Sequence, residues 1–428
     1  MNRLEAFDPF AEETIDCPYE FYQAMREQAP VYKASDGVYF VTTYDLIRKV
    51  LVDAETFSSR NGAAFLNFQG EEGLAPPSAP PPEIVDILRH GVAPRDTMLS
   101  ADPPEHTRFR ALVNRSLAPK RVARLEPVIH QVVSDLIDSF IERGEVEFVS
   151  EFSMMVPLTV VSLALGVPAS ELHNYKRWSI ESTKILAGRV SAEQAVVSAQ
   201  ASVDLQNYLA DQVEAARIEP LENLVGDLVN AHMIADETDT GEKEYRPLDT
   251  PEIVSILQQL LVAGQETVNY LLSSTMLNLV ENPSEMAKVS EDPSLMPELL
   301  EEGLRFDSPI QALGRFVTRD TELGGVSLPE GARLMVMYGC GNRDESVFAD
   351  PEKFQIQRND ERNHIAFGAG PHYCVGANLA RLESQIAMDH LLRRLQNIRL
   401  APDKNDFKHQ YNFIFRALES LHLQFETR

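Results

Sequence analysis

The feature that most constrains the fold is one helical pattern that runs over residues 250–281. Thr250, Pro251 and Glu252 are typical of a helix start, with a capping hydroxyl, a proline in the first turn and an early acid. At 1.5 Å per residue the helix is about 45 Å long, which is enough to cross a whole domain. Apolar residues occur nearly all round it, so we expect it to be buried in the middle of the protein.

The centre of this helix contains residues that a buried helix normally avoids. It reads Ala263, Gly264, Gln265, Glu266 and Thr267. A glycine costs about 1 kcal/mol inside a helix, and a buried carboxylate is costly unless it is paired. Such local violations tend to mark functional sites. The alternative is structural: Thr267 bonds back to the carbonyl of Ala263, and Glu266 faces solvent.

A second constraint lies in residues 367–377, which read Phe-Gly-Ala-Gly-Pro-His-Tyr-Cys-Val-Gly-Ala and lead directly into a helical pattern. Cys374 stands in a glycine-punctuated turn before a helix N-terminus, which favours the thiolate form. Glycine also lets a flat ligand approach the chain closely. The pattern indicates a metal ligand beside a planar cofactor. The alternative is that Cys374 is an inert buried thiol, as most lone cysteines are.

This segment resembles the haem-binding signature of the cytochrome P450 monooxygenases, Phe-Gly-x-Gly-x-His-x-Cys-x-Gly. The resemblance implies that Cys374 is the axial thiolate ligand of the iron of haem b. It also implies a mainly α fold with a smaller β region, shaped as a triangular helical prism with the long central helix over the haem. We expect one domain over residues 1–428. The matched positions are Phe367, Gly368, Gly370, His372, Cys374 and Gly376.

The centre of the long helix resembles the family's Ala-Gly-x-(Asp/Glu)-Thr motif on the distal side of the haem. The resemblance implies that Ala263 and Gly264 contact the cofactor, and that Ala263 also borders the substrate. Glu266 and Thr267 would be catalytic, because cleavage of dioxygen needs protons in a pocket otherwise too dry to supply them. Thr267 would hold a water, and Glu266 would relay protons from solvent.

Four residues resemble family positions that contact the haem propionates. His106 and Arg110 open a predicted helix, and a guanidinium suits a carboxylate through paired hydrogen bonds. Arg315 and His372 are the other two expected contacts. For His106 and Arg110 alone, an ordinary solvated helix face is the alternative.

Two further segments match the family. Gln311 and Leu313 lie in a predicted strand whose side chains would face the substrate. Glu302 and Arg305 are three residues apart and share a helix face. They match the family's buried Glu-x-x-Arg pair, a structural feature whose later partner is expected in residues 342–344.

Residues 58–100 are rich in glycine, proline and polar residues. A loop of this length inside a compact domain is usually functional or disordered. The resemblance implies that it folds over the substrate, with Phe65, Leu66, Phe68 and Met98 as candidates to line the pocket.

Composition excludes several kinds of partner. The formal net charge of −26 argues against nucleic acid and anionic membranes, which repel an acidic protein. The longest apolar stretch, residues 154–167, is too short to span a bilayer, and the N-terminus resembles no signal segment. Three widely spaced cysteines indicate a reducing compartment. We therefore expect a cytoplasmic protein.

The resemblance as a whole implies a haem-thiolate monooxygenase that inserts one atom of O2 into a small, mostly apolar organic substrate. The sequence has no flavin or dinucleotide fingerprint and no iron–sulfur cysteine cluster. We therefore expect electrons from NAD(P)H through ferredoxin reductase and ferredoxin. One alternative is a peroxide-driven peroxygenase of the same family, and another is a haem protein that only senses gas or carries electrons. The acid and threonine on the long helix argue against both.

Residues 107–124 reverse the charge of the chain, since they contain six basic residues and no acidic one. Ferredoxins are usually acidic, and in the family this region borders the haem face from which electrons arrive. Complementary charge mainly raises association rates. The expected docking residues are Arg108, Arg115, Lys120 and Arg121. The alternative is that they are solvated surface charges, which contribute little.

Overall fold

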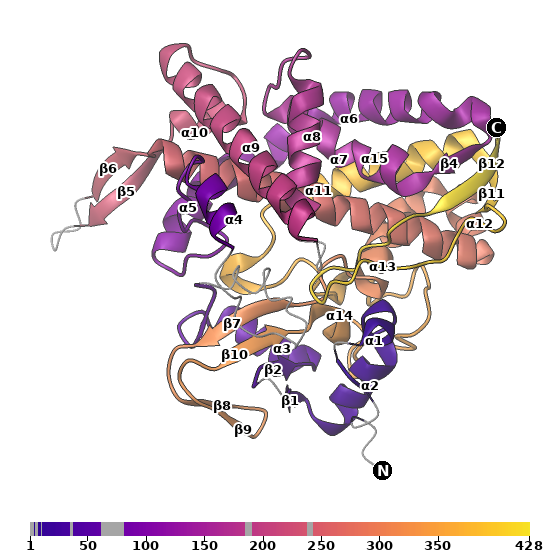
Figure 1. Cartoon of the computed structure of the whole chain (residues 1–428). Coiled ribbons are helices and arrows are strands. Elements are labelled where there is room, and N and C mark those ends of the chain that lie inside the picture. Colours follow the sequence, from indigo (N-terminus) through magenta and orange to yellow (C-terminus); the bar gives the residue numbers. More distant parts are fainter. Residues whose placement is uncertain are drawn as a thin grey trace.

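The computed structural model separates a helical part from a smaller β part (Figure 1). Most helices gather in the upper half of the view, whereas the largest sheet lies below them with the N-terminal helices. The structure describes residues 4, 7–9, 11–34, 37–60, 81–184, 191–237 and 243–428. The mainly α fold with a smaller β region is therefore as predicted.

The described part of the chain contains fifteen α-helices and twelve strands. The helices are α1 (Glu12–Asp16), α2 (Tyr19–Gln28), α3 (Tyr44–Val52), α4 (Pro82–Leu88), α5 (Glu105–Ser116), α6 (Pro119–Phe140), α7 (Met155–Ala164), α8 (Leu172–Thr183), α9 (Ala192–Ile218), α10 (Leu224–Val229), α11 (Thr250–Glu281), α12 (Pro283–Glu291), α13 (Met296–Phe306), α14 (Tyr338–Gly341) and α15 (Ala377–Arg394). The strands are β1 (Val31–Lys33), β2 (Tyr39–Val41), β3 (Phe57–Ser58), β4 (Glu145–Glu147), β5 (His232–Glu237), β6 (Lys243–Pro247), β7 (Leu313–Val317), β8 (Thr321–Leu323), β9 (Val326–Leu328), β10 (Arg333–Val336), β11 (Leu395–Leu400) and β12 (His422–Thr427).

The long helix α11 has the predicted bounds, but its cap differs from the prediction. Asp249, not Thr250, is the N-cap residue. Its side chain accepts from the backbone N–H of Glu252, whose own side chain accepts from the N–H of Asp249. This reciprocal pair satisfies two helix-end donors. The helix then passes between α7, α9, α13 and α15, so the prediction of a central buried helix is confirmed.

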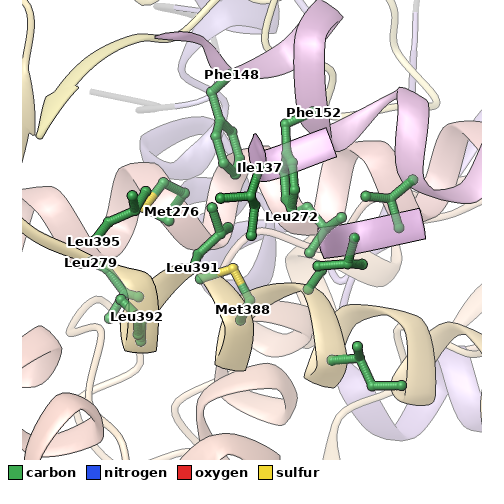
Figure 2. Close-up of a cluster of buried hydrophobic side chains, with 14 of the residues drawn as sticks. Ile137, Phe148, Phe152, Leu272, Met276, Leu279, Met388, Leu391, Leu392 and Leu395 are labelled. Carbon is green, nitrogen blue, oxygen red and sulfur yellow. The ribbon is translucent and has the colours of Figure 1, made fainter. Parts of the chain in front are cut away.

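The largest hydrophobic core joins α11 to helices on either side of it (Figure 2). Leu272, Met276 and Leu279 of α11 pack against residues of α6, α15, β11 and the segment before α7. These partners include Ile137, Phe148, Phe152, Met388, Leu391, Leu392 and Leu395. Since a fully buried large apolar side chain contributes about 1.5–3 kcal/mol, this core fixes α15 relative to α11.

The main sheet has the strand order β1-β2-β10-β7-β3. In its centre β10 pairs in parallel with β2 and antiparallel with β7, which places Leu334 opposite both Tyr39 and Arg315. The sheet thus holds Arg315 at a defined register. The expected loop over residues 58–100 is partly wrong, because α4 lies within it. Its candidates Phe65, Leu66 and Phe68 lie outside the described residues, and Met98 is buried in the helical core.

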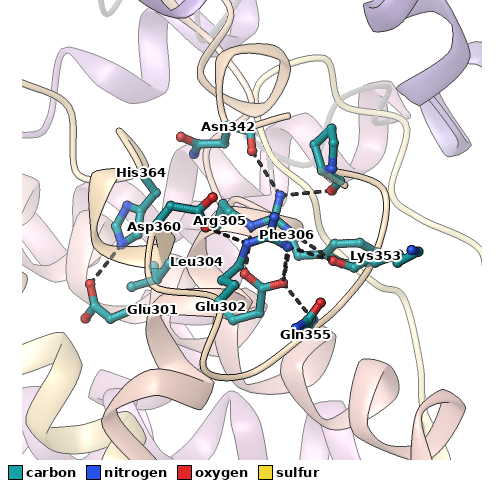
Figure 3. Close-up of polar contacts among 12 residues, drawn as sticks. Glu301, Glu302, Leu304, Arg305, Phe306, Asn342, Lys353, Gln355, Asp360 and His364 are labelled. Atoms are coloured by element: carbon teal, nitrogen blue, oxygen red, sulfur yellow. Dashed lines mark hydrogen bonds and ion pairs between the residues drawn. The ribbon is translucent and has the colours of Figure 1, made fainter. Parts of the chain in front are cut away.

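Glu302 and Arg305 of α13 form a fully buried ion pair (Figure 3). Both side chains are 0% exposed, with two hydrogen bonds of 2.7 and 2.8 Å between them. Arg305 also donates to the carbonyl of Asn342, within the predicted partner segment. The sequence patterns did not predict Arg358, a second cation 3.4 Å from Glu302. Every charge in this group is therefore paired, as burial requires.

No helix of the described residues is both long and apolar enough to cross a membrane.

Candidate active site

The segment before α15 is folded into a tight loop that presents Cys374. The backbone N–H of Cys374 donates to the carbonyl of Phe367 at 2.8 Å, which closes the loop. Gly368 and Gly370 have φ of 71° and 66°, in the left-handed region that favours glycine. At Gly370 a Cβ atom would also lie 2.4 Å from the carbonyl oxygen of Leu51. The loop therefore requires glycine at position 370 for two independent reasons.

The thiol of Cys374 lies at the N-terminus of α15, where backbone amides face it. Burial raises the pKa of Cys374, whereas the N–H groups of Gly376 and Ala377 and the charges of Arg110 and Arg381 act to lower it. Cys374 forms no disulfide. The sulfur is thus positioned for a ligand that stabilises its thiolate, as a bound metal ion does.

The predicted propionate contacts come together beside this loop from three separate parts of the chain. The rings of His106 (α5) and His372 are 4.1 Å apart. Both ring nitrogens of His106 and Nε2 of His372 are buried without a partner. Burial and then the charges of Arg315, His106 and Arg110 lower the pKa of His372 to about 3, so this ring is neutral.

Arg315 and Arg110 add positive charge to this cluster. Arg315 is 6% exposed and donates to the carbonyl of Gly314 at 2.7 Å. No carboxylate of the described residues pairs with it. Arg110 donates to the carbonyl of Tyr373, the residue before Cys374. Buried polar groups are normally satisfied, so these cations and orphaned nitrogens fit a ligand with carboxylate groups.

The distal motif lies on α11 with Ala263 exposed and Gly264 and Thr267 partly exposed. At Gly264 an added Cβ would meet only Val161, at 3.8 Å. The hydroxyl of Thr267 donates to the carbonyl of Ala263 at 2.7 Å, which is the structural alternative for this residue. Glu266 does not follow its structural alternative, because it is partly buried and burial raises its pKa.

Sequence reasoning missed a second buried network that supports the cysteine loop. Glu301, next to the predicted Glu302, accepts two hydrogen bonds from Arg381 at 2.5 and 2.9 Å, and lies 3.0 Å from Nε2 of His364. Burial raises the pKa of Glu301, but Arg381 and His364 outweigh it and hold that pKa at about 2. Arg381 also lies 4.5 Å over the ring of Phe367. The loop is thus clamped from α13 and α15.

The two substrate candidates before Arg315 have different environments. The Oε1 atom of Gln311 accepts from the hydroxyl of Tyr22 at 3.0 Å, and its Nε2 donates to the carbonyl of Ser308 at 2.7 Å. Gln311 is 3% exposed, so its amide belongs to the framework and is not available as a polar anchor for substrate. Leu313 begins β7 and is partly exposed.

The expected docking residues are also not equivalent. Arg121 forms an ion pair with Asp227 of α10, which reduces its free charge. Arg115 and Lys120 are exposed, and no acidic side chain of the described residues lies within ion-pair distance of either. Arg108 is partly buried. The open positive charge is therefore concentrated where α5 ends and α6 begins.

A family model described as Cytochrome P450 matches residues 76–417. The chain belongs to the cytochrome P450 family. Cytochrome P450 107B1 of Saccharopolyspora erythraea is 34% identical over 98% of this chain and 96% of its own length. Steroid C26-monooxygenase of Mycobacterium tuberculosis is 32% identical over 89% of this chain and 87% of its own. The structure of cytochrome P450 CREJ in complex with (4-ethylphenyl) dihydrogen phosphate has a TM-score of 0.85 at 30% identity, covering 99% of this chain and 100% of that one.

This P450 is therefore a haem-binding monooxygenase that uses O2 and an organic substrate. Haem b is the cofactor of the family. The described residues fit it on their own chemistry. A thiol suits the iron, unsatisfied histidine nitrogens and two guanidinium groups suit the propionates, and the accessible face of α11 carries small residues.

We expect the Gly370→Ala variant to lose far more stability than Gly325→Ala. Both glycines have positive φ, which costs about 1–2 kcal/mol for alanine. Only Gly370 would also bring Cβ against backbone, for which overpacking adds about 1–3 kcal/mol. Denaturant unfolding of both variants, with haem absorbance, measures the difference. Equal losses would show that the contact with Leu51 is not a constraint.

Proposed function

We propose that Cys374 is the axial ligand of haem b in a monooxygenase that acts on a small, mostly apolar substrate. The protein would act in the cytoplasm, with residues 1–428 as one functional unit. The observation that carries the proposal is the closed loop that sets a thiol at the N-terminus of α15 beside the cationic cluster. Electrons would come from NAD(P)H through ferredoxin reductase and ferredoxin. The cytoplasmic location is supported by three cysteines that form no disulfide.

When bound, haem b would supply the activation of dioxygen, with one oxygen atom going to the substrate and the other to water, and two electrons and two protons consumed. Around it Cys374 would bind the iron, and Gly368 and Gly376 would allow close approach. The propionate groups would accept from His106, Arg110, Arg315 and His372. Phe367, whose ring lies under the guanidinium of Arg381, would also contact the cofactor.

Glu266 and Thr267 would deliver protons on the other side of the cofactor. Burial raises the pKa of Glu266, and a carboxyl group whose pKa lies nearer to neutrality exchanges protons more readily at working pH. The hydroxyl of Thr267 would turn from the carbonyl of Ala263 toward a water in the pocket. A peroxygenase, a gas sensor or an electron carrier would have no use for this pair.

The relatives support an apolar substrate but not a particular one. Their names include a steroid C26-monooxygenase and a 6-deoxyerythronolide B hydroxylase. A structural neighbour is P450BioI, which was solved in complex with an acyl carrier protein ligated to hexadec-9Z-enoic acid. Ala263 and Leu313, both apolar and accessible, are the proposed contacts with such a substrate.

Substitution of Cys374 should abolish thiolate ligation. Reduced wild-type protein with carbon monoxide should show the red-shifted Soret band of a haem thiolate, and Cys374→Ala should lack it. Cys340→Ala is the matched control, since Cys340 is also a free thiol but is 0% exposed in another core. A thiolate spectrum that survives in Cys374→Ala would refute the assignment.

Substitutions on α11 should separate proton delivery from substrate binding. Thr267→Ala should still bind substrate and consume NADH, but release several times more hydrogen peroxide per product, whereas Thr267→Ser should stay near wild type. Glu266→Gln should slow product formation by about a hundredfold, the typical worth of a proton-transfer group. If the peroxide released per product in Thr267→Ala and the rate of product formation in Glu266→Gln are both unchanged, the two residues have only structural roles. Turnover with hydrogen peroxide alone tests the peroxygenase alternative.

The docking face for ferredoxin is proposed at the exposed cations between α5 and α6. Arg115→Glu and Lys120→Glu should each reduce the rate of haem reduction by ferredoxin at low salt, roughly tenfold, because they reverse the steering charge. Arg108→Glu should act in the same direction. Arg121→Glu is less informative, since it would also repel Asp227.

Arg399→Glu, an exposed cation on β11 after the far end of α15, is the control for charge reversal. Stopped-flow reduction at several ionic strengths provides the measurement. If the rate of haem reduction changes neither with the substitutions nor with the ionic strength, electrons enter at another part of the surface.

A further inference from the structure

A tyrosine outside the family motif holds the carboxyl group of Glu266. Tyr270 lies one turn further along α11, and its hydroxyl donates to Oε2 of Glu266 at 2.6 Å. Helical side chains lean toward the N-terminus, which brings residue i+4 over residue i. Tyr270 is 5% exposed. The catalytic candidate Thr267 bonds elsewhere, to Ala263. In this arrangement Tyr270, and not Thr267, orients the acid.

The other groups that face Glu266 are few and uncharged. On α11, Nε2 of Gln265 lies 3.4 Å from Oε1 of Glu266, while the Oε1 atom of Gln265 is buried without a partner. From α8, Thr183 lies near the carboxylate, but its hydroxyl donates to the carbonyls of Ser179 and Ile180. In the described parts of the chain no lysine, arginine or histidine lies within ion-pair distance of Glu266. The acid is therefore poised by hydrogen bonds alone.

Tyr270 also connects Glu266 to the C-terminal segment. Its ring centroid lies 5.8 Å from that of Phe415. Phe415 forms an isolated β-bridge with Ile310, and the N–H of Gln311 donates to the carbonyl of Ile414 at 2.6 Å. Ile310 and Gln311 precede β7, whose first residue is a proposed substrate contact. One side chain thus spans from the acid to a segment that borders the pocket.

We propose that Tyr270 is a positioning residue for Glu266: its hydroxyl holds the carboxyl group in one orientation, and its ring ties that orientation to Phe415. The proposal rests on the proposed role of Glu266 in proton delivery. It differs from that role because it concerns the residue that orients the carboxyl group of Glu266, and this residue lies outside the motif of residues 263–267.

The hydroxyl has a defined electrostatic consequence. Burial raises the pKa of Glu266, while the hydrogen bond from Tyr270 acts in the opposite direction, because it stabilises the charged form. Loss of the Tyr270 hydroxyl leaves burial less opposed, so the pKa of Glu266 rises further. One hydrogen bond to a charged group corresponds to roughly a tenfold change in the ionisation constant, or about one pH unit.

Infrared spectroscopy of the haem-loaded enzyme over a pH series provides a test that does not depend on turnover. The carboxyl band of protonated Glu266 is identified by its loss in Glu266→Gln. In Tyr270→Phe its titration midpoint should move up by about one pH unit. Phe415→Leu keeps the hydroxyl but loosens the ring contact, and should shift the midpoint less in the same direction.

Tyr175→Phe is the matched control, because Tyr175 is a buried tyrosine of α8 whose ring packs on Tyr208 at 6.1 Å. Its midpoint should equal that of the wild type. A midpoint in Tyr270→Phe that also equals the wild type would overturn the proposal, and no shift in Phe415→Leu would remove the tie to the C-terminal segment. If Tyr270→Phe shifts the band while Glu266→Gln turns over normally, the positioning stands and the proton-delivery role fails.

Discussion

Two adjacent acids on α13 support the whole cysteine-bearing side of the protein. Glu302 is fully buried with Arg305, and a buried charge is tolerated only when it is paired and hydrogen-bonded. The pair meets this requirement through Arg358 and the carbonyls of Asn342, Pro351 and Lys353. Glu301 binds His364 and Arg381 on either side of the cysteine loop. The loop is therefore anchored at its start and its end to one helix.

The same helix couples the cysteine loop to the long helix α11. Helix α13 packs on α11, and Gly303 makes this approach possible, since an added Cβ would lie 2.4 Å from the hydroxyl oxygen of Thr275. Through Arg305 and Glu301 the position of the thiol is fixed relative to α13, and through Gly303 that of α13 is fixed relative to α11. The position of the cysteine loop relative to α11 is thus set by helix packing.

The residues beside Cys374 are basic, although the chain as a whole is acidic. The formal net charge is −26, yet Arg110, Arg315 and two histidines with unsatisfied nitrogens converge beside Cys374. A buried positive charge with no acidic partner is unfavourable, so a ligand with carboxylate groups would stabilise this cluster. Glu266 on α11 differs from this cluster, because it is an acidic group whose hydrogen-bond partners, Gln265 and Tyr270, are uncharged. Under the proposed function, the two sides would serve different tasks, which are ligand binding and proton exchange.

The sequence by itself determined what depends on neighbours in the chain. The bounds of α11, the glycine-dependent loop before Cys374 and the pairing of Glu302 with Arg305 all follow from spacings of a few residues, whose geometry is set by the local backbone. Only the tertiary structure decided the links of Glu301 to Arg381, of Arg121 to Asp227 and of Gln311 to Tyr22. These partners lie far apart in sequence, and side-chain packing alone brings them within hydrogen-bonding distance. Tyr270 is intermediate: its spacing from Glu266 is local, but burial, which only the fold provides, makes their hydrogen bond strong enough to matter.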